Sequence, residues 1–309
     1  MSYLAAQALR LAAGALQLPE SLARRHAAYL AAAQNIDGGF SGRQGPSDLY
    51  YTSFALRGLS LLGRLDDCVA RPAAGFLQRR LEQQVGTIDF LALVPSAVLL
   101  ELVTGEDVFA AGPRDRLGWV SAFLQDLRRD DGGYAKGPGG RQSSTYATFL
   151  AASCLQLLGL SVEDAAAMAS LVRSRRRADG GFVEAAPLKQ GGTNPTAAAV
   201  ATLRLLDGLD GETARSAAAF LAGMQNAEGG LRANTRIPIA DLLSTFTGLV
   251  ALADLGKLAL IDRAAVRRYV ASLEMPAGGF RGGAWDNDPD VEYTFYGLGS
   301  LALLEAVES

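Results

Sequence analysis

The 309-residue chain has few cysteines and no strong excess of either charge. Cys68 and Cys154 are its only cysteines, and they lie far apart in the sequence. Two such residues are too few for a disulfide framework, which favours a reducing, cytoplasmic compartment. The net charge of −3 gives no reason to expect nucleic acid as a partner.

Long uninterrupted hydrophobic runs are also scarce. The N-terminal stretch LAAQALRLAAGALQL has Arg10 in its middle and no basic leader, so we expect a helix there rather than a signal peptide. The longest apolar run, FLALVPSAVLL at 90–100, contains Pro95 and is shorter than a membrane span requires. We therefore expect no transmembrane segment.

Glycine, in contrast, is abundant and recurs in a fixed pattern. The segments are QNIDGGF (34–40), RRDDGGY (128–134), RRADGGF (176–182), QNAEGGL (225–231) and EMPAGGF (274–280). Their first glycines lie 94, 48, 49 and 49 residues apart, and a degenerate copy is expected at Gly86. Six units, roughly 20–65, 66–112, 113–160, 161–209, 210–256 and 257–309, then cover the chain as one domain.

Each unit is expected to hold two helices, separated by the glycine signature. The first helices are predicted at 22–34, 69–84, 115–129, 162–177, 211–225 and 262–275, and they carry charge. The second helices are predicted at 49–63, 90–104, 144–159, 195–207, 241–255 and 291–306, and they are apolar on nearly all sides. Six outer helices should therefore enclose six inner ones, with an extra helix at 4–17 covering the first repeat.

This pattern predicts an all-α fold, an (α/α)6 toroid of six hairpins with an additional N-terminal helix. An open solenoid of the HEAT type has a similar period, but the six units and the glycine pair in every hairpin favour the closed ring. The ring is too wide for side chains to fill, so an apolar cavity is expected inside it. Its predicted lining includes Tyr51, Tyr146, Phe149, Phe246, Tyr293 and Tyr296.

The loops before the inner helices predict an anion-binding mouth. In a ring, these helix N-termini converge, and their dipoles and free N–H groups attract anions. The same loops carry basic residues, among them Lys189, Arg232 and Arg236. An anion-attracting mouth above an apolar cavity suits an isoprenoid diphosphate, because each buried methylene contributes about 0.8 kcal/mol of transfer energy.

Two long segments carry a resemblance to a known family. The stretch from LGKLALIDRAAVRRYV to DNDPDVEYTFYGLGSLALLE (255–305) resembles the protein prenyltransferase β-subunit family, closest to the β subunit of Rab geranylgeranyltransferase. The stretch EGGLRANTRIPIADLLSTFTGLVALADLG (228–256) does so as well. A more distant likeness is to the squalene and hopene cyclases. The resemblance implies a toroid, a central isoprenoid cavity and, in the transferases, a helical α-type subunit as partner.

The family's site residues carry over only in part. The resemblance implies a zinc site made of an Asp-x-Cys pair and a histidine, and here those positions are Asp241, Leu243 and Tyr293. Zinc is therefore not expected, and protein-cysteine prenylation is doubtful. In the family's diphosphate cradle, a histidine position is Thr193 and a tyrosine position is Ser244. Arg232 and Arg236 are candidates for its basic pair.

The acidic run DNDPD leaves one metal hypothesis open. Asp286, Asp288, Asp290, Glu292 and Asp241 could form an oxygen-only cluster suited to Mg²⁺, or serve simply as N-caps and loop charges. The run lacks the Asp-x-Asp-Asp spacing of class II cyclases. No catalytic residue is assigned.

Three functions stay open at this point: a prenyltransferase-like or terpene-cyclase-like enzyme that uses Mg²⁺ rather than zinc, a non-catalytic isoprenoid-binding protein, and a protein-interaction toroid.

Overall fold

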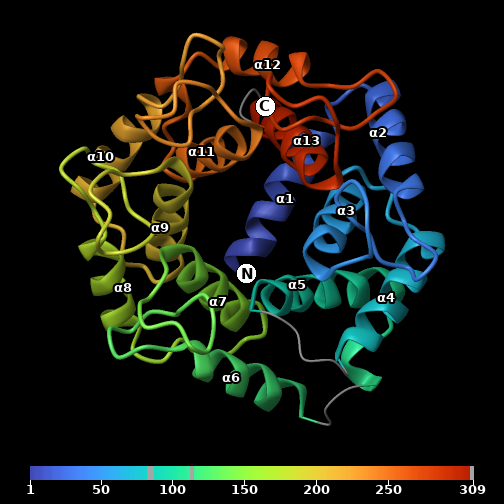
Figure 1. Cartoon of the computed structure of the whole chain (residues 1–309), viewed down its shortest axis with the longest axis horizontal. Helices are drawn as coiled ribbons and strands as arrows, with labels where there is room; N and C mark the ends of the chain where they lie inside the picture. The colour runs from blue at the N-terminus through green and yellow to red at the C-terminus, as the bar shows by residue number, and fades with distance from the viewer. Residues whose placement is uncertain (82–86, 112–114, 307–309) are drawn as a thin grey trace. The chain divides into compact units, whose positions relative to one another are not determined.

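A computed structural model describes residues 1–81, 87–111 and 115–306, and the predicted degenerate copy at Gly86 lies outside these ranges. Within them the chain is all-α, with thirteen α-helices and no extended strand, as predicted (Figure 1). The helices group into two compact units. Unit 1 comprises Met1–Gln7 with Phe123–Ser272, and unit 2 comprises Ala8–Ala122 with Leu273–Ser309.

Unit 1 holds the middle of the chain. Its elements are the end of α6 (Arg116–Leu127), α7 (Thr145–Leu157), α8 (Ala165–Ser174), α9 (Thr193–Leu205), α10 (Gly211–Ala222), α11 (Leu242–Asp254), the 3-10 turn η2 (Leu258–Leu260) and α12 (Arg263–Ser272). Helix α9 packs between α7 and α11, and α8 and α10 pack against α9 from the outside. The alternation of an outer and an inner helix along the chain is thus as predicted.

Unit 2 combines the beginning and the end of the chain. Its elements are most of α1 (Tyr3–Ala15), α2 (Glu20–Ala32), α3 (Leu49–Leu61), α4 (Asp67–Leu81), α5 (Thr87–Thr104), the 3-10 turn η1 (Val108–Ala111), the start of α6 and α13 (Val291–Ala306). Helix α3 packs between α5 and α13, while α2 packs on α3 and α4 packs on α5. The last inner helix therefore lies beside the first.

Burial separates the two helix classes as their sequences predict. The inner helix α13 buries twelve of its sixteen residues. The outer helix α12 buries only Val266, Tyr269 and Val270 of its ten. A helix that is apolar all round is buried on all sides, whereas an amphipathic one keeps a wet face.

Helix α5 includes the inner helix predicted at 90–104, although this segment contains Pro95. The helix continues through Pro95 for 18 residues, and by length and composition it could cross a membrane. Proline removes one backbone N–H from the helix interior but does not prevent the helix from continuing when tertiary packing holds it. Here Phe90, Leu93 and Val94 are fully buried, and α5 packs against α3 and α4.

The glycine signature makes a tight turn, and its predicted role in the hairpins is confirmed. In the first repeat, the amide of Asn35 donates to the carbonyl oxygen of Gly39 at 2.9 Å, and Gly38 has a φ of +85°. A Cβ atom on Gly38 would lie 2.1 Å from the carbonyl oxygen of Pro72 in α4. Glycine is required twice over, for its positive φ and for the close approach of the next outer helix.

The same contact recurs at the other signatures. Their first glycines have φ values between +85° and +101° and approach the outer helix that follows; they are Gly132, Gly180, Gly229 and Gly278. For Gly278, the neighbouring outer helix is α2, where the carbonyl oxygen of Arg25 would lie 2.8 Å from an added Cβ atom. Each signature therefore joins its own hairpin to the next one, and the sixth joins the first.

Candidate functional site

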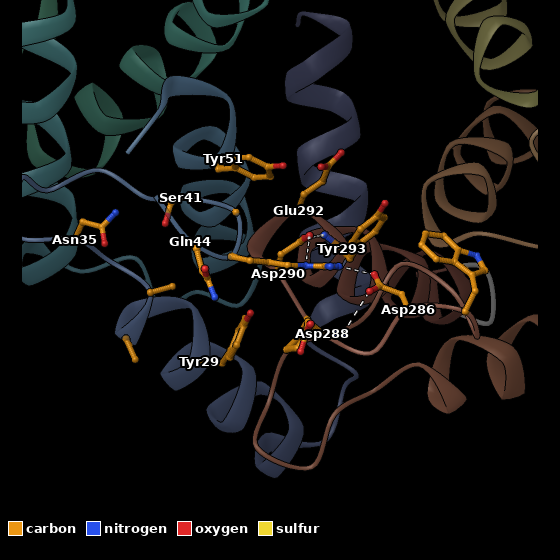
Figure 2. Close-up of a pocket in the computed structure, with 16 residues that line it drawn as sticks. Tyr29, Asn35, Ser41, Gln44, Tyr51, Asp286, Asp288, Asp290, Glu292 and Tyr293 are labelled. Atoms are coloured by element: carbon orange, nitrogen blue, oxygen red, sulfur yellow. Dashed lines mark hydrogen bonds and ion pairs between the residues drawn. The ribbon is translucent and has the colours of Figure 1, made fainter. Parts of the chain in front are cut away.

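A cavity of about 1050 Å³ opens in unit 2 (Figure 2). Its walls come from the end of α2, the loop 41–44, the first turn of α3, the loop 285–290 and the first turn of α13. Tyr29, Tyr51 and Tyr293 contribute aromatic rings, and Trp285, which also lines the cavity, is 55% exposed. The cavity is thus bounded by the loops that precede two adjacent inner helices.

Charge in this cavity is strongly unequal. Four carboxylates line it, from Asp286, Asp288, Asp290 and Glu292, whereas Arg43 is its only cationic lining residue among those the structure describes. The Arg43 guanidinium donates to the Asp286 carboxylate, and its Nε lies 3.6 Å from Asp290 Oδ2. Asp286 and Asp290 are 6% and 4% exposed. One guanidinium therefore bridges two buried acids.

The pKa values of the two buried acids are shifted in opposite directions. Burial raises the pKa of Asp290 to about 6, although its carboxylate caps α13 by accepting the Tyr293 amide at 2.8 Å. At Asp286 burial acts the same way, but hydrogen bonds from Arg43 and from the Gly282 amide outweigh it and hold the pKa below its usual range. Near neutral pH the Asp286 carboxylate is charged, and Asp290 takes up a proton under mildly acidic conditions.

Glu292 completes the acidic wall. Its Oε1 atom accepts the hydroxyl of Tyr50 at 2.6 Å and that of Tyr296 at 3.1 Å. Burial raises the pKa of Glu292, and these two hydrogen bonds oppose the rise.

These contacts decide between the two alternatives for the acids, a Mg²⁺ cluster and N-caps with loop charges. Within residues 1–81, 87–111 and 115–306, no three His, Cys, Asp or Glu side chains are gathered so that they could hold a metal ion. Asp286 is bound to Arg43, Asp290 caps a helix, and Glu292 is bound by two tyrosines. The Mg²⁺ alternative is therefore contradicted, and Asp241 and Asp290 have the N-cap role of the other alternative.

The residues predicted for the diphosphate mouth lie in unit 1. The Thr193 amide donates to the carbonyl oxygen of Ala233 at 2.9 Å, and the Thr193 hydroxyl donates to that of Arg232 at 2.5 Å. These bonds lay the loop of the fifth repeat over the N-terminus of α9. Lys189 and Arg236 are exposed on the two loops that meet there.

Arg232 and Ser244 are less accessible than their predicted role suggests. The Arg232 guanidinium donates to the carbonyl oxygen of Gly223, beyond the end of α10, at 3.1 Å. Ser244 is fully buried, and its amide donates to the Asp241 carboxylate at 2.6 Å. Asp241 is thereby the N-cap of α11, and burial raises its pKa. The neighbouring Leu243 offers only hydrocarbon.

The six predicted cavity aromatics have different surroundings. In unit 1, Phe246 is buried, Tyr146 is 40% exposed, and the ring of Phe149 lies edge-on to Tyr3 at 5.9 Å. In unit 2, Tyr51 and Tyr293 line the acidic cavity, and Tyr296 is buried with its hydroxyl on Glu292.

Sequence reasoning missed the threonines that hold the signatures in place. The residue after each glycine pair donates its amide to a threonine hydroxyl on the inner helix at 2.9–3.1 Å. The threonines are Thr52, Thr148, Thr196, Thr245 and Thr294. Each lies four residues after its helix's N-cap position, a spacing that the sequence displays in every complete repeat.

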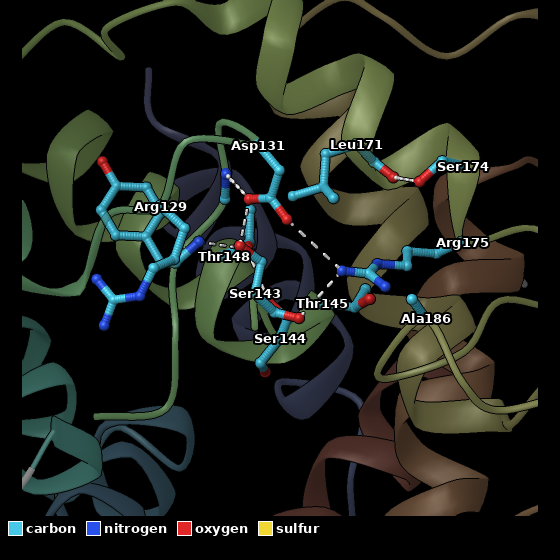
Figure 3. Close-up of polar contacts among 12 residues, drawn as sticks. Arg129, Asp131, Ser143, Ser144, Thr145, Thr148, Leu171, Ser174, Arg175 and Ala186 are labelled. Carbon is cyan, nitrogen blue, oxygen red and sulfur yellow. Dashed lines mark hydrogen bonds and ion pairs between the residues drawn. The ribbon is translucent and has the colours of Figure 1, made fainter. Parts of the chain in front are cut away.

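A second set of missed anchors involves the acid before the glycine pair. In the third repeat, Asp131 accepts the Ser143 hydroxyl and the Gly133 amide (Figure 3). The buried Arg175 donates to the Ser143 carbonyl oxygen at 3.2 Å. The sixth signature has Ala277 where the others have an acid. There the Nδ1 atom of His26, from α2, accepts the Gly279 amide at 2.9 Å in place of a carboxylate.

Comparisons with known proteins agree with this architecture. A family model, the prenyltransferase alpha-alpha toroid domain, matches residues 14–91 and 100–309. A sequence comparison with curated proteins gave no match.

Among solved structures, the chain is similar to Candida albicans protein geranylgeranyltransferase-I complexed with GGPP. The TM-score is 0.70 at 16% sequence identity, and 91% of each chain is covered. The chain is also similar to a variant of the type II terpene cyclase MstE from Scytonema in complex with geranylgeranyl dihydroxybenzoate. Here the TM-score is 0.62 at 12% identity, and the match covers 98% of this chain and 99% of the cyclase.

The fold extends beyond terpenoid proteins. The GH76A α-1,6-mannanase from Salegentibacter is similar with a TM-score of 0.63 at 12% identity, covering 93% of this chain and 98% of the enzyme. At such identities the structural likeness shows the fold alone, whereas the family model covers most of the sequence. The chain therefore belongs to the prenyltransferase alpha-alpha toroid domain family.

Proposed function

We propose that this protein binds an isoprenoid diphosphate and does not use the family's zinc chemistry to prenylate protein cysteines. The observation that carries the proposal is the junction in unit 1 at which the Thr193–Ala233 bond brings the basic loop of the fifth repeat to the start of α9, next to the loop that carries Lys189. Lys189 and Arg236 are exposed there, available to an anionic group. A diphosphate carries the charge and the acceptor oxygens that such a pair attracts.

The lipid part would lie along the apolar inner helices of the same unit. Phe149 on α7 and Phe246 on α11 are the aromatic contacts that we assign to it. Support comes from two relatives in fold, whose structures contain GGPP and geranylgeranyl dihydroxybenzoate. We therefore expect a geranylgeranyl chain to be preferred over shorter prenyl groups.

The residues at the family's three zinc-ligand positions support the absence of a zinc site. The three family positions are Asp241, Leu243 and Tyr293, and leucine has no lone pair to offer. The Asp241 carboxylate already accepts the Ser244 amide, and a neutral tyrosine is a poor zinc ligand. Without a metal, an acceptor thiol with a pKa of about 8.5 is only a few per cent ionised at neutral pH. Family-type cysteine prenylation should therefore be negligible.

Binding of geranylgeranyl diphosphate and of geranylgeraniol, measured by calorimetry, tests the proposal. Arg236→Ala should weaken the diphosphate about tenfold and leave the alcohol unchanged, since it removes one charge-assisted contact. Arg215→Ala, at an exposed arginine on the outer helix α10, is the matched control and should change neither affinity.

Three other outcomes would change the conclusion. Failure of both lipids to bind would favour a toroid that serves only in protein interaction. Equal weakening of diphosphate and alcohol by Arg236→Ala would remove Arg236 from the diphosphate site. Thioether formation on a cysteine peptide with added zinc would contradict the loss of the transferase reaction.

A further inference from the structure

The acidic cavity of unit 2 has no role in the proposed isoprenoid site, and its construction indicates a ligand of its own. At about 1050 Å³ it is large enough for a small organic molecule. It is confined to unit 2, whereas the diphosphate contacts proposed above lie in unit 1.

Two independent features of the walls indicate the charge of that ligand. Four carboxylates face one guanidinium, so the cavity attracts cations. Aromatic rings from Tyr29, Tyr51 and Tyr293 share the same walls. Trp285 also lines the cavity and keeps more than half of its surface exposed. A large exposed indole beside carboxylates is the arrangement that recognises organic cations through their contact with an aromatic face.

The layout also distinguishes an organic cation from a metal ion. In the part of the chain that the structure describes, no three acidic, His or Cys side chains are gathered as a metal would require. The carboxylates instead come from the loop 285–290 and the first turn of α13, with Asp286 and Asp290 already bonded to Arg43 and to the α13 cap. A dispersed charge such as a guanidinium can contact separated carboxylates and an aromatic face at the same time.

The contacts of Arg43 show that carboxylates of this cavity bind a guanidinium group. Its guanidinium, on a side chain that is 39% exposed, is bound to Asp286 and lies 3.6 Å from Asp290. The exposed Asp288 lies next to this bound pair in the loop and also lines the cavity. Asp288 is the exposed acid of the cavity, and Trp285 is its exposed aromatic residue.

We propose that this cavity is a binding site for an organic cation, a guanidinium or ammonium group carried by a small molecule or by a basic residue of a peptide. Asp288 would supply the charged contact and Trp285 the aromatic face. Asp286 and Asp290, already held by Arg43 and by the α13 cap, would set the surrounding negative potential.

The fluorescence of Trp285 provides a direct assay. Trp119 is the only other tryptophan, so a Trp119→Phe background isolates the signal. The probes are L-arginine amide, a blocked Gly-Arg-Gly tripeptide and, as an isosteric neutral control, L-citrulline amide. We expect both arginine compounds to give a saturable change and citrulline amide to give none. The relative affinities of the amide and the tripeptide then distinguish a small-molecule source from a peptide source.

Two variants and one control sharpen the test. Asp288→Asn should weaken L-arginine amide about tenfold, because a charge-assisted hydrogen bond becomes a weaker neutral one. Trp285→Ala, followed by calorimetry, should weaken it about threefold. Glu212→Gln makes the same change in net charge on an exposed residue of unit 1 and should have no effect. Asp290 is not substituted because it caps α13.

Equal binding of arginine amide and citrulline amide, or an unchanged affinity in Asp288→Asn, would overturn the proposal. Binding of geranylgeranyl diphosphate is measured separately with the same proteins. Its loss in Arg236→Ala but not in Asp288→Asn would show that the two sites are independent, so failure of one proposal can be told from failure of the other.

Discussion

The last two repeats have equivalent inner-helix contacts, but the loops before their inner helices carry opposite charges. In the fifth repeat, Asp241 caps α11 by accepting the Ser244 amide at 2.6 Å. In the sixth, Asp290 caps α13 by accepting the Tyr293 amide at 2.8 Å. A threonine four residues later receives the signature's amide in both. Yet the loop before Asp241 carries Arg232 and Arg236, and the loop before Asp290 carries Asp286 and Asp288.

This comparison teaches that the repeat fixes where a loop emerges but not what the loop binds. The backbone bonds that hold the two loops use glycine, threonine and an aspartate cap, and none of them depends on the charge of the intervening residues. Loop charge is therefore free to differ between repeats. The fifth loop suits an anion and the sixth a cation, although their helices are equivalent.

The largest expected effect on the free energy of unfolding concerns the side chains that hold each glycine signature in place. In the sixth repeat, His26 from α2 is fully buried, accepts the Gly279 amide, lies 3.0 Å from Glu274 Oε1 and stacks on Phe280. In the fifth, the exposed Glu228 accepts the Ala240 amide at 2.7 Å. His26→Ala should lower the free energy of unfolding by about 3 kcal/mol, because it leaves a cavity and unsatisfied polar groups.

Urea unfolding of both variants measures this difference. Glu228→Ala should cost only about 1 kcal/mol, since the exposed Glu228 side chain leaves no cavity and the Ala240 amide loses one acceptor. Equal losses in the two variants would contradict the conclusion that the sixth signature depends on a contact from the first outer helix.

A smaller effect should appear in the pH dependence of stability. The pKa of Asp290 is raised to about 6 from the ordinary value of 3.8, mainly by burial. Between these values the folded state binds more protons than the unfolded chain, so the contribution of Asp290 to stability falls as the pH rises through this window. Asparagine is also a good N-cap but does not titrate.

Relative to Asp290→Asn, the wild-type protein should therefore lose on the order of 2 kcal/mol of unfolding free energy between about pH 4 and about pH 7. Urea titrations at a series of pH values measure this change. Asp241→Asn is the matched variant in the fifth repeat, where burial shifts the pKa in the same direction, and a smaller loss is expected. A wild-type protein that gains stability over this range relative to Asp290→Asn would contradict the raised pKa.

The smallest expected effect tests whether the two scaffolds are equivalent. Thr245 and Thr294 are fully buried, and their hydroxyls accept the amides of Leu231 and Phe280 at 3.0 and 3.1 Å. Thr245→Val and Thr294→Val keep the side-chain shape but leave one buried amide without its acceptor, so each should cost about 1 kcal/mol. Thermal unfolding should give nearly equal losses; a difference of about 2 kcal/mol would show that the repeats are held differently.

Much of the fold could be predicted from the sequence, because both of its signals are local. The 48-residue period follows from glycines that need a positive φ and a close approach, as at Gly38. The order of outer and inner helices follows from their charge patterns. Every helix predicted within the described residues is present, with ends that differ by a few residues. The helix predicted at 90–104 forms although it contains Pro95, because packing of α5 compensates for the missing N–H.

The candidate sites were less predictable. The acids at 286–292 could be listed from the sequence, but whether they gather around a metal or pair with Arg43 depends on a loop about 240 residues away. The same is true of His26, the only histidine, whose contact with Gly279 spans 253 positions.

The sequence by itself thus determined the repeat and the helices, since these depend on residues within one hairpin. Only the tertiary structure decided which loops meet. It brought Arg43 to the acids of the last repeat and laid the basic fifth loop over α9, because charge partners and burial are set by packing between repeats.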